Sequence, residues 1–597
     1  MKMNRIFLAA AALALAATVA RGQDLNPTVE VTNTYQSKFS DVRKPQIGMN
    51  IPDSLLRFDL DFDYEVFDKP YQGAYSFKPY MLAMKPEKDA WRGKSLYLEA
   101  GAGYSLHPVL EFVYSPEMTG RFQWSVYASH GSYVGRYHRI APEPAGAGRF
   151  DLNKTGTHRD GHDLSTAAGF DGRVRWDRAT LTFGAGYSGL ATRDTLTRRS
   201  WNAADFRMRV KSEGGGGNYF LYDAGLRGRF ATDNLDTSIP VHGGTDPYGR
   251  KKLTESWFVL EGEAGPVLDD AHSILVGFEG TTCTYGNLFE GSVGRLALSP
   301  RYRLRKGRWN LSLGLRFETI ARGDQKDSPD FLAISRHKGR TFYPDVRVGF
   351  EAIEKHLSLY AGLTGSSHLN PYSSLIAGNH HVVPFYTLGI HPLIDNGVEK
   401  VNVSVGARGS VTSRLQFDVK AGGAVHENGL LDALSYDSGG NLRPSLTYTD
   451  HDVIFADLLL GWKSKDVSVE GAFHYRNTGI EEKTPEEELR NRTARAALEL
   501  PAFSGTVRAT WSINPRVYLG LAAEGASCRD AVTVDGTSEI RRRIPGWVDT
   551  GIFGGYRATR KTEVWARTGN LLGMNIQRNP FYAERGPWFT AGITLNL

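Results

Sequence analysis

The chain has 597 residues, a formal net charge of +6 and only 41% hydrophobic residues. No apolar run near 18 residues follows the first 20, so the sequence predicts no transmembrane helices. The many glycines (66) and the aromatic content of 11% are typical of a β-rich protein with tight turns and aromatic residues at a membrane interface.

The first residues have the organisation of a secretory signal peptide. Lys2 and Arg5 precede an apolar stretch, Ile6–Ala20, and small residues then stand where a signal peptidase reads the chain. We therefore expect residues 1–22 to be removed by cleavage before Gln23. Without the signal's three positive charges the net charge is near +3, which is too weak to argue for a nucleic-acid partner.

Residues 23–93 differ from the rest of the chain because they are rich in proline and show only scattered alternation. They predict a periplasmic or lumen-filling segment with few regular elements, the first domain after the signal. Its start contains a short β-prone run, Thr28-Val29-Glu30-Val31-Thr32. Such an accessible run can add as a strand to the edge of another protein's sheet.

From Ser95 onward apolar and polar residues alternate. In Trp309–Glu318, for example, five apolar residues occupy one face, while the other face carries polar and charged residues. Segments of this kind are roughly ten residues long, which is the length a tilted strand needs to cross a bilayer. A water-filled lumen tolerates charges on the polar face and a soluble core does not. We expect six side chains to face this lumen, namely Arg316, Arg408, Asp418, Lys420, Glu470 and His474.

The connections between these segments alternate between short turns and long polar stretches such as Tyr137–Asp163 and His426–Asp450. Short periplasmic turns and longer extracellular loops produce this alternation in outer-membrane barrels. Residues 94–597 therefore predict a transmembrane antiparallel β-barrel of about 22 strands, with a range of 18–22. Two places fit less well: the short connection Leu106–Pro108, and Asn491–Ile513, which must form one bent strand.

The last strand, Pro587–Leu597, alternates between an apolar and a polar face. It resembles the C-terminal signal that the barrel-assembly machinery reads in bacterial outer-membrane barrels. The residues that carry this resemblance are Thr590, Gly592, Leu595 and Leu597, although the usual last residue is aromatic. The alternative, which we favour less, is the closing strand of a soluble sandwich.

The C-terminal region resembles that of TonB-dependent outer-membrane receptors, in which an Asn-Leu-Leu follows the penultimate strand. Here Asn570-Leu571-Leu572 follows Trp565-Ala566-Arg567, ahead of the closing strand. Thr28–Thr32 resembles the TonB box, and this implies TonB as a partner. The family's plug domain is roughly twice as long as the segment from Gln23 to Ser95, so the resemblance covers the barrel and not the plug domain. A large barrel of another family is the alternative.

Other groups in the sequence carry no catalytic, metal or cofactor prediction. His158 and His162, with Asp160 and Asp163, and the pair His380-His381 lie in predicted loops; we favour solvated polar loops over metal sites. Ser468, Glu470 and His474 share a strand face but stand too far apart for direct hydrogen bonds. Cys283 and Cys528 are better explained as two unrelated thiols than as a disulfide.

The sequence thus predicts an integral protein of the bacterial outer membrane that is not an enzyme. The hypothesis is a receptor or transporter like TonB-dependent receptors, whose extracellular loops bind an unidentified ligand. Outer-membrane lipid, the assembly machinery and TonB are the expected partners. A passive porin-like channel and a non-transport scaffold or adhesin remain open alternatives.

Overall fold

The computed structural model describes residues 95–597, apart from 105–106, 119, 147, 194–196, 213–218, 238–249, 270, 288–289, 323–338, 383–395, 437–441, 481–496 and 536–537. The predicted signal peptide, residues 23–93 and the Thr28–Thr32 run lie outside the described residues. The described part forms one 24-stranded sheet and one short helix. None of its helices is long and apolar enough to cross a membrane.

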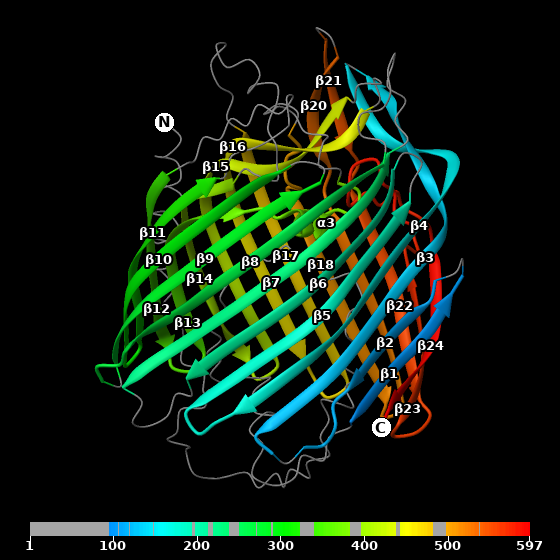
Figure 1. The fold of residues 1–597 in the computed structure, drawn as a ribbon. Helices are drawn as coiled ribbons and strands as arrows, with labels where there is room; N and C mark the ends of the chain where they lie inside the picture. Colours follow the sequence, from blue (N-terminus) through cyan, green and yellow to red (C-terminus); the bar gives the residue numbers. More distant parts are fainter. Residues whose placement is uncertain are drawn as a thin grey trace.

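The strands follow the chain order around the sheet (Figure 1). Their bounds are β1 (Leu96–Gly103), β2 (Val109–Tyr114), β3 (Phe122–Gly146), β4 (Arg149–Arg175), β5 (Ala179–Arg193), β6 (Thr197–Ser212), β7 (Phe220–Thr237), β8 (Arg250–Pro266), β9 (His272–Gly286), β10 (Gly291–Lys306), β11 (Trp309–Arg322), β12 (Gly339–Ile353), β13 (Leu357–Leu369), β14 (Asn396–Thr412), β15 (Leu415–Tyr436), β16 (Leu442–Lys463), β17 (Val467–Ile480), β18 (Phe503–Asn514), β19 (Val517–Ala526), β20 (Arg529–Asp535), β21 (Ser538–Ile544), β22 (Trp547–Arg557), β23 (Thr562–Gly569) and β24 (Trp588–Asn596); the helix α3 is Tyr372–Gly378.

The sheet closes on itself as an antiparallel barrel. Consecutive strands pair from β1 to β19 and from β22 to β24, and β24 pairs with β1 to complete the ring. Strand β19 pairs directly with β22, so β20 and β21 form a separate hairpin in the connection between them. Twenty-two of the 24 strands therefore make the ring, and the predicted fold and strand number are confirmed.

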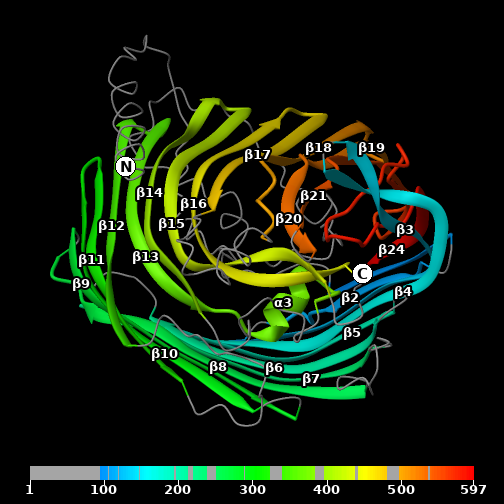
Figure 2. The same ribbon diagram turned by 90° about the horizontal axis from the view of Figure 1, so that it is seen from above.

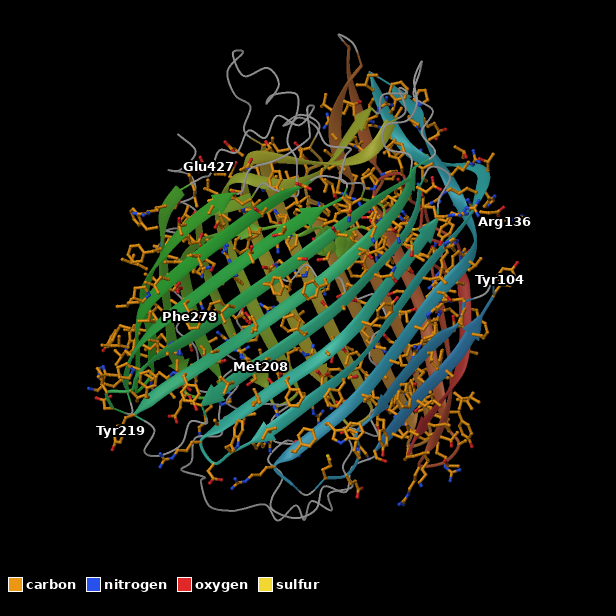
Figure 3. The ribbon with its side chains drawn as sticks, in the orientation of Figure 1. Tyr104, Arg136, Met208, Tyr219, Phe278 and Glu427 are labelled. Carbon is orange, nitrogen blue, oxygen red and sulfur yellow. The ribbon has the colours of Figure 1, made fainter. Side chains whose placement is uncertain are left out.

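The two faces of the wall differ in chemistry, as the alternation requires. On β11, Leu313, Leu315 and Phe317 are 45%, 47% and 48% exposed, whereas Glu318 is buried on the opposite face. Figure 3 shows Met208 and Phe278 on this outer wall, where they are also exposed. An apolar outer band around a polar interior is the pattern of barrels that contact lipid.

Several segments predicted to be loops are strands instead. Tyr137–Asp163 forms the outer part of the β3–β4 hairpin, and most of His426–Asp450 belongs to β15 and β16. Outside the lipid neither face needs apolar residues, so the strand pattern disappears from the sequence although the ladder of backbone hydrogen bonds continues. The expected single strand Asn491–Ile513 is also wrong, because β18 begins only at Phe503.

The predicted assembly signal lies at the closing seam. Thr590 is buried and its hydroxyl is 2.9 Å from Nδ1 of His107, while Gly592 pairs with Gly101 of β1. Leu595 pairs with Leu98, and Leu597 exchanges backbone hydrogen bonds with Leu96. The assembly machinery's recognition of these residues stays a prediction.

Replacing Gly592 by leucine is expected to impair closure of the barrel. A Cβ atom at this position would lie 2.4 Å from both the Ala100 carbonyl oxygen and Cζ2 of Trp565. Backbone cannot yield as a flexible side chain does, so overpacking should cost at least about 1–3 kcal/mol. The heat-modifiable, folded fraction on gels should fall severalfold. The matched control is Gly461→Leu, because a Cβ there meets nothing within 4 Å; equal folding of the two variants would contradict the argument.

Candidate functional site at the external mouth of the barrel

The connection between β13 and β14 folds into the barrel. Its described part, residues 370–382, contains α3 and is called the α3 segment below. Figure 2 shows α3 inside the ring of strands. Pro371 immediately precedes the helix, Gly378 ends it, and Asn379 returns to an extended conformation. The side chains that contact this segment therefore face the lumen.

A buried arginine of the wall holds the end of the α3 segment. Nε of Arg199 on β6 is 3.0 Å from a carboxylate oxygen of Asp233 on β7, and both side chains are 1% exposed. Arg199 also donates hydrogen bonds to the hydroxyl of Tyr372, at 2.8 Å, and to the carbonyls of His380 and Val382. A buried charge is stable only when it is paired and hydrogen-bonded, so this arrangement fixes the segment to the wall.

The beginning of the segment has its own attachments. The carboxylate of Glu255 on β8 accepts hydrogen bonds from the backbone N–H (3.1 Å) and the hydroxyl (2.6 Å) of Ser373. Asn370 donates to the hydroxyl of Tyr448 on β16, at 2.9 Å. An apolar cluster of segment and wall residues surrounds these polar contacts; its members include Trp201, Leu253, Tyr285, Tyr372, Ile376 and Val382.

The last residues of the segment contact the β4 strand and the C-terminal connection. Nδ1 of His380 is 3.1 Å from a carboxylate oxygen of Asp163, and the ring of His381 stacks on Tyr582 with centroids 3.5 Å apart. The sequence predicted a solvated loop for His380-His381. The structure instead gives both rings specific partners, because the connection turns inward.

The ion pair between His380 and Asp163 predicts a pH dependence. Burial lowers the pKa of His380, but the hydrogen bond and charge of Asp163 outweigh it and the net pKa is raised. A raised pKa means that the pair stabilises the segment below the ordinary histidine pKa and that this contribution is lost as pH rises through the raised value. A spin label at Ala377→Cys, in a Cys528→Ser background, should become more mobile as the pH rises above the ordinary histidine pKa. The His380→Gln variant should lack this change; an identical titration in both proteins would contradict it.

Segment 570–587, between β23 and β24, meets β3, β4 and the start of β24 in a group of aromatic rings and guanidinium groups. Arg159 lies over Tyr137 and Tyr582, at 5.0 and 5.4 Å from the ring centroids. Arg585 lies 4.1 Å from the centroid of Trp588. Stacked cations and rings of this kind suit a ligand that has π-faces or negative charge.

A small polar cavity lies within this group. Its volume is about 50 Å³, and its lining residues are Asp549, Asn570, Ile576, Arg578, Glu584, Arg585 and Trp588. Arg578 pairs with Glu524 at 2.9 Å, with Asp549 at 3.4 Å and with Glu584 at 3.4 Å. The charges that line the cavity are thus paired with one another and held in place.

Hairpins and connections pack together above the barrel. A second apolar cluster joins Leu152 of β4, Leu434 of β15, Leu498, Ala531 of β20 and Ile544 of β21. Strand β21 also pairs in parallel with β4, from Arg541–Arg543 to Arg149–Asp151. Figure 1 shows β20, β21 and the outer ends of β3 and β4 above the ring. These residues are called the outer cap below.

The six residues predicted to face the lumen lie in networks along the wall. Arg316 pairs with Glu318 and, at 2.7 Å, with Glu279. The Tyr360 hydroxyl donates to Asp418 and lies under Arg408, whose guanidinium carbon is 4.8 Å from the ring centroid. Lys420 is 5.2 Å from the Phe455 centroid, Glu470 lies opposite Arg508 in the β17–β18 register, and His474 is 2.7 Å from Asp457.

Residue pairing also bears on the other groups considered. His474 has Asp457 of β16 as its partner, and not Ser468 or Glu470 from its own strand. Cys283 is buried, Cys528 is exposed and both are free, as expected. Within the described ranges no group of three or more His, Cys, Asp or Glu side chains is arranged to hold a metal ion.

No pattern in the sequence marks the residues that hold the α3 segment. Arg199, Asp233, Glu255 and Tyr372 each occur in an ordinary local pattern, and the Arg199–Tyr372 contact spans 173 residues. An aligned set of homologues with paired changes would reveal such a contact, but a single sequence has no periodicity that encodes it.

No family model matches the sequence, and no curated protein matches it. The structure is similar to a mutant of the ferric enterobactin receptor PfeA from Pseudomonas aeruginosa (TM-score 0.56, 12% identity, 84% of this chain and 80% of that chain). It is also similar to the siderophore receptor PirA from Acinetobacter baumannii (0.57, 9%, 84% and 80%) and to the FrpB iron transporter from Neisseria meningitidis (0.61, 9%, 85% and 83%). Identities this low show a shared fold, which is the barrel fold of TonB-dependent receptors, as the C-terminal region implied.

Proposed function

We propose that this protein is a gated receptor and transporter of the bacterial outer membrane. It captures a ligand at the external mouth and releases it through the lumen. The observation that carries the proposal is the α3 segment, which lies inside the barrel and is held there by the buried Arg199–Asp233 pair. An open pore does not need a segment attached inside its lumen. The attachment of the α3 segment therefore favours a receptor over the passive channel.

The ligand path follows from the charges that line the wall. The outer cap and the aromatic–guanidinium group around Tyr582 and Arg585 bind the ligand first. Below them, paired charges such as Arg316 with Glu279 give way to the ligand without large changes in the wall. The fold is similar to that of the ferric enterobactin receptor PfeA and of the iron transporter FrpB. This similarity makes an iron-containing ligand the first candidate.

Transport against a gradient needs energy from the inner membrane. In this proposal Thr28–Thr32 couples the barrel to that energy, by adding as a strand to the periplasmic domain of TonB. The assembly machinery inserts the barrel after the signal peptide is removed, and outer-membrane lipid surrounds its apolar face. These parts of the proposal rest on the sequence resemblance.

Deletion of Thr28–Thr32 tests the energised mechanism. Iron-starved cells that express the full chain should accumulate ⁵⁵Fe-enterobactin, and the deletion should reduce accumulation to the level of cells without the chain. A purified TonB periplasmic domain should retain the full protein and not the deletion variant, whichever ligand is the natural one. The matched control removes five other residues, Lys44–Gly48, and should behave like the full chain. Unchanged uptake together with unchanged TonB retention would sink the energised mechanism.

A further inference from the structure

Two histidines lie side by side on the outer part of the β3–β4 hairpin. Strand β2 pairs with β3 only as far as Gly131, and β5 pairs with β4 only as far as His162, so the hairpin continues beyond both neighbours. Figure 3 marks Arg136 on this extension, above the barrel wall. In the extension His138 is directly opposite His158, with ring centroids 4.5 Å apart and planes inclined by 40°.

The surroundings leave both rings free to act as ligands. Nδ1 of His138 is buried and has no hydrogen-bond partner, and His158 is exposed. Lys154 is held elsewhere, since its ammonium group donates to the Gly573 carbonyl at 3.0 Å, and Arg159 stacks on Tyr137 and Tyr582.

The separation of the two rings is suited to binding of both by one metal ion. A metal–imidazole bond is about 2 Å long and the nitrogen lies about 1.2 Å from the ring centre, so two rings at adjacent, roughly 90° positions have centroids about 4.5 Å apart. Tetrahedral positions would need about 5 Å, and rings on opposite sides of one metal more than about 6 Å. The observed 4.5 Å is close to the separation of adjacent ligands on one ion and far below that of rings on opposite sides of one.

We propose that His138 and His158 bind a divalent copper ion at adjacent coordination positions. Among the common divalent first-row ions, Cu²⁺ binds imidazole nitrogens most tightly. The described residues offer no third His, Cys, Asp or Glu side chain to this ion, so water fills the other positions. The ion is therefore held by two protein ligands, and it crosslinks the two strands beside the irregularity that follows His138.

The structure pairs His158 with a different histidine from the one that the sequence motif suggests. The motif His158-Arg159-Asp160-Gly161-His162-Asp163 draws attention to His158 and His162 as a pair. Both lie on β4, where four residues span about 13 Å along the strand, too far for two bonds to one ion. The partner of His158 comes from β3, 20 positions earlier in the chain, and only the hairpin register identifies it.

Copper binding to the full mature protein in detergent, without a histidine tag, tests the proposal. Titration calorimetry should show one Cu²⁺ site, and electron paramagnetic resonance should show a tetragonal signal with coupling to two nitrogens. Either His138→Ala or His158→Ala should weaken binding at least about tenfold, since each removes one of two protein ligands. Acidification should release the ion, because protonated imidazole does not coordinate.

The matched control is His162→Ala, which removes the other histidine of the motif and should leave copper affinity unchanged. Folding of every variant is checked by heat-modified gel mobility, and His158→Ala is the safer variant because His158 is exposed. Copper binding that neither His138→Ala nor His158→Ala weakens would overturn the proposal, as would the absence of one-to-one binding. Tighter binding of Zn²⁺ than of Cu²⁺ would overturn the assignment of the metal.

Discussion

Replacing Arg199 by methionine is expected to raise the ion conductance of the protein sharply. Methionine fills a similar volume but cannot pair with Asp233 or donate to the carbonyls of His380 and Val382. Removal of one partner from a buried ion pair costs about 3–5 kcal/mol, because the other charge stays behind without compensation. The contacts that are lost hold the α3 segment, whereas the strands keep their backbone ladders. The substitution should therefore loosen the segment and leave the wall intact.

Single-channel recording in planar bilayers checks this expectation, both in the mature protein and in a form without residues 23–93. The matched control is Arg207→Met on the same strand and face. Arg207 pairs with Asp171, is 58% exposed and makes no contact with the α3 segment. The control should conduct like the parent protein. A folded Arg199→Met variant that stays closed in both forms would show that the segment does not control the lumen.

Removal of residues 23–93 is expected to convert a closed protein into a conducting one. A barrel of 22 strands is wide enough to need material in its lumen to be closed. We expect that the N-terminal segment and the α3 segment share this task, so the shortened protein should conduct in steps limited by the α3 segment. Arg199→Met in the shortened protein should then enlarge each step.

The same recordings separate the gated receptor from the passive channel. A full-length protein that conducts steadily, with no change on removal of residues 23–93, would favour the porin-like alternative. The receptor fold would then be inherited without the receptor mechanism. A closed full-length protein and an open shortened one would assign the N-terminal segment the role of a reduced plug.

The sequence by itself determined the barrel. Alternation such as Leu313 and Leu315 against Gly314 and Arg316 shows one face for lipid and one for water, and lipid admits strands only in a closed ring. The alternation of short and long connections then set the number of strands near 22. These features are local and repeat in every strand, so a single sequence carries them many times over.

Outside the lipid the sequence does not show which residues form strands. The alternation does not predict the outer parts of β3, β4, β15 and β16, because their faces meet water in some places and packed neighbours, as at Leu152 and Leu434, in others. Only hydrogen bonds between backbones distinguish these strands from loops, and side-chain composition does not report them.

The site depended wholly on the tertiary structure. The inward turn of the α3 segment, the Arg199–Asp233 pair that holds it and the His138–His158 pair on the outer hairpin join residues from different strands. Barrel closure and strand register decide which of these side chains meet, and a one-residue slip would separate them all. Period-2 alternation fixes the face on which a residue lies but leaves its neighbour across the strand undetermined, and binding chemistry depends on that neighbour.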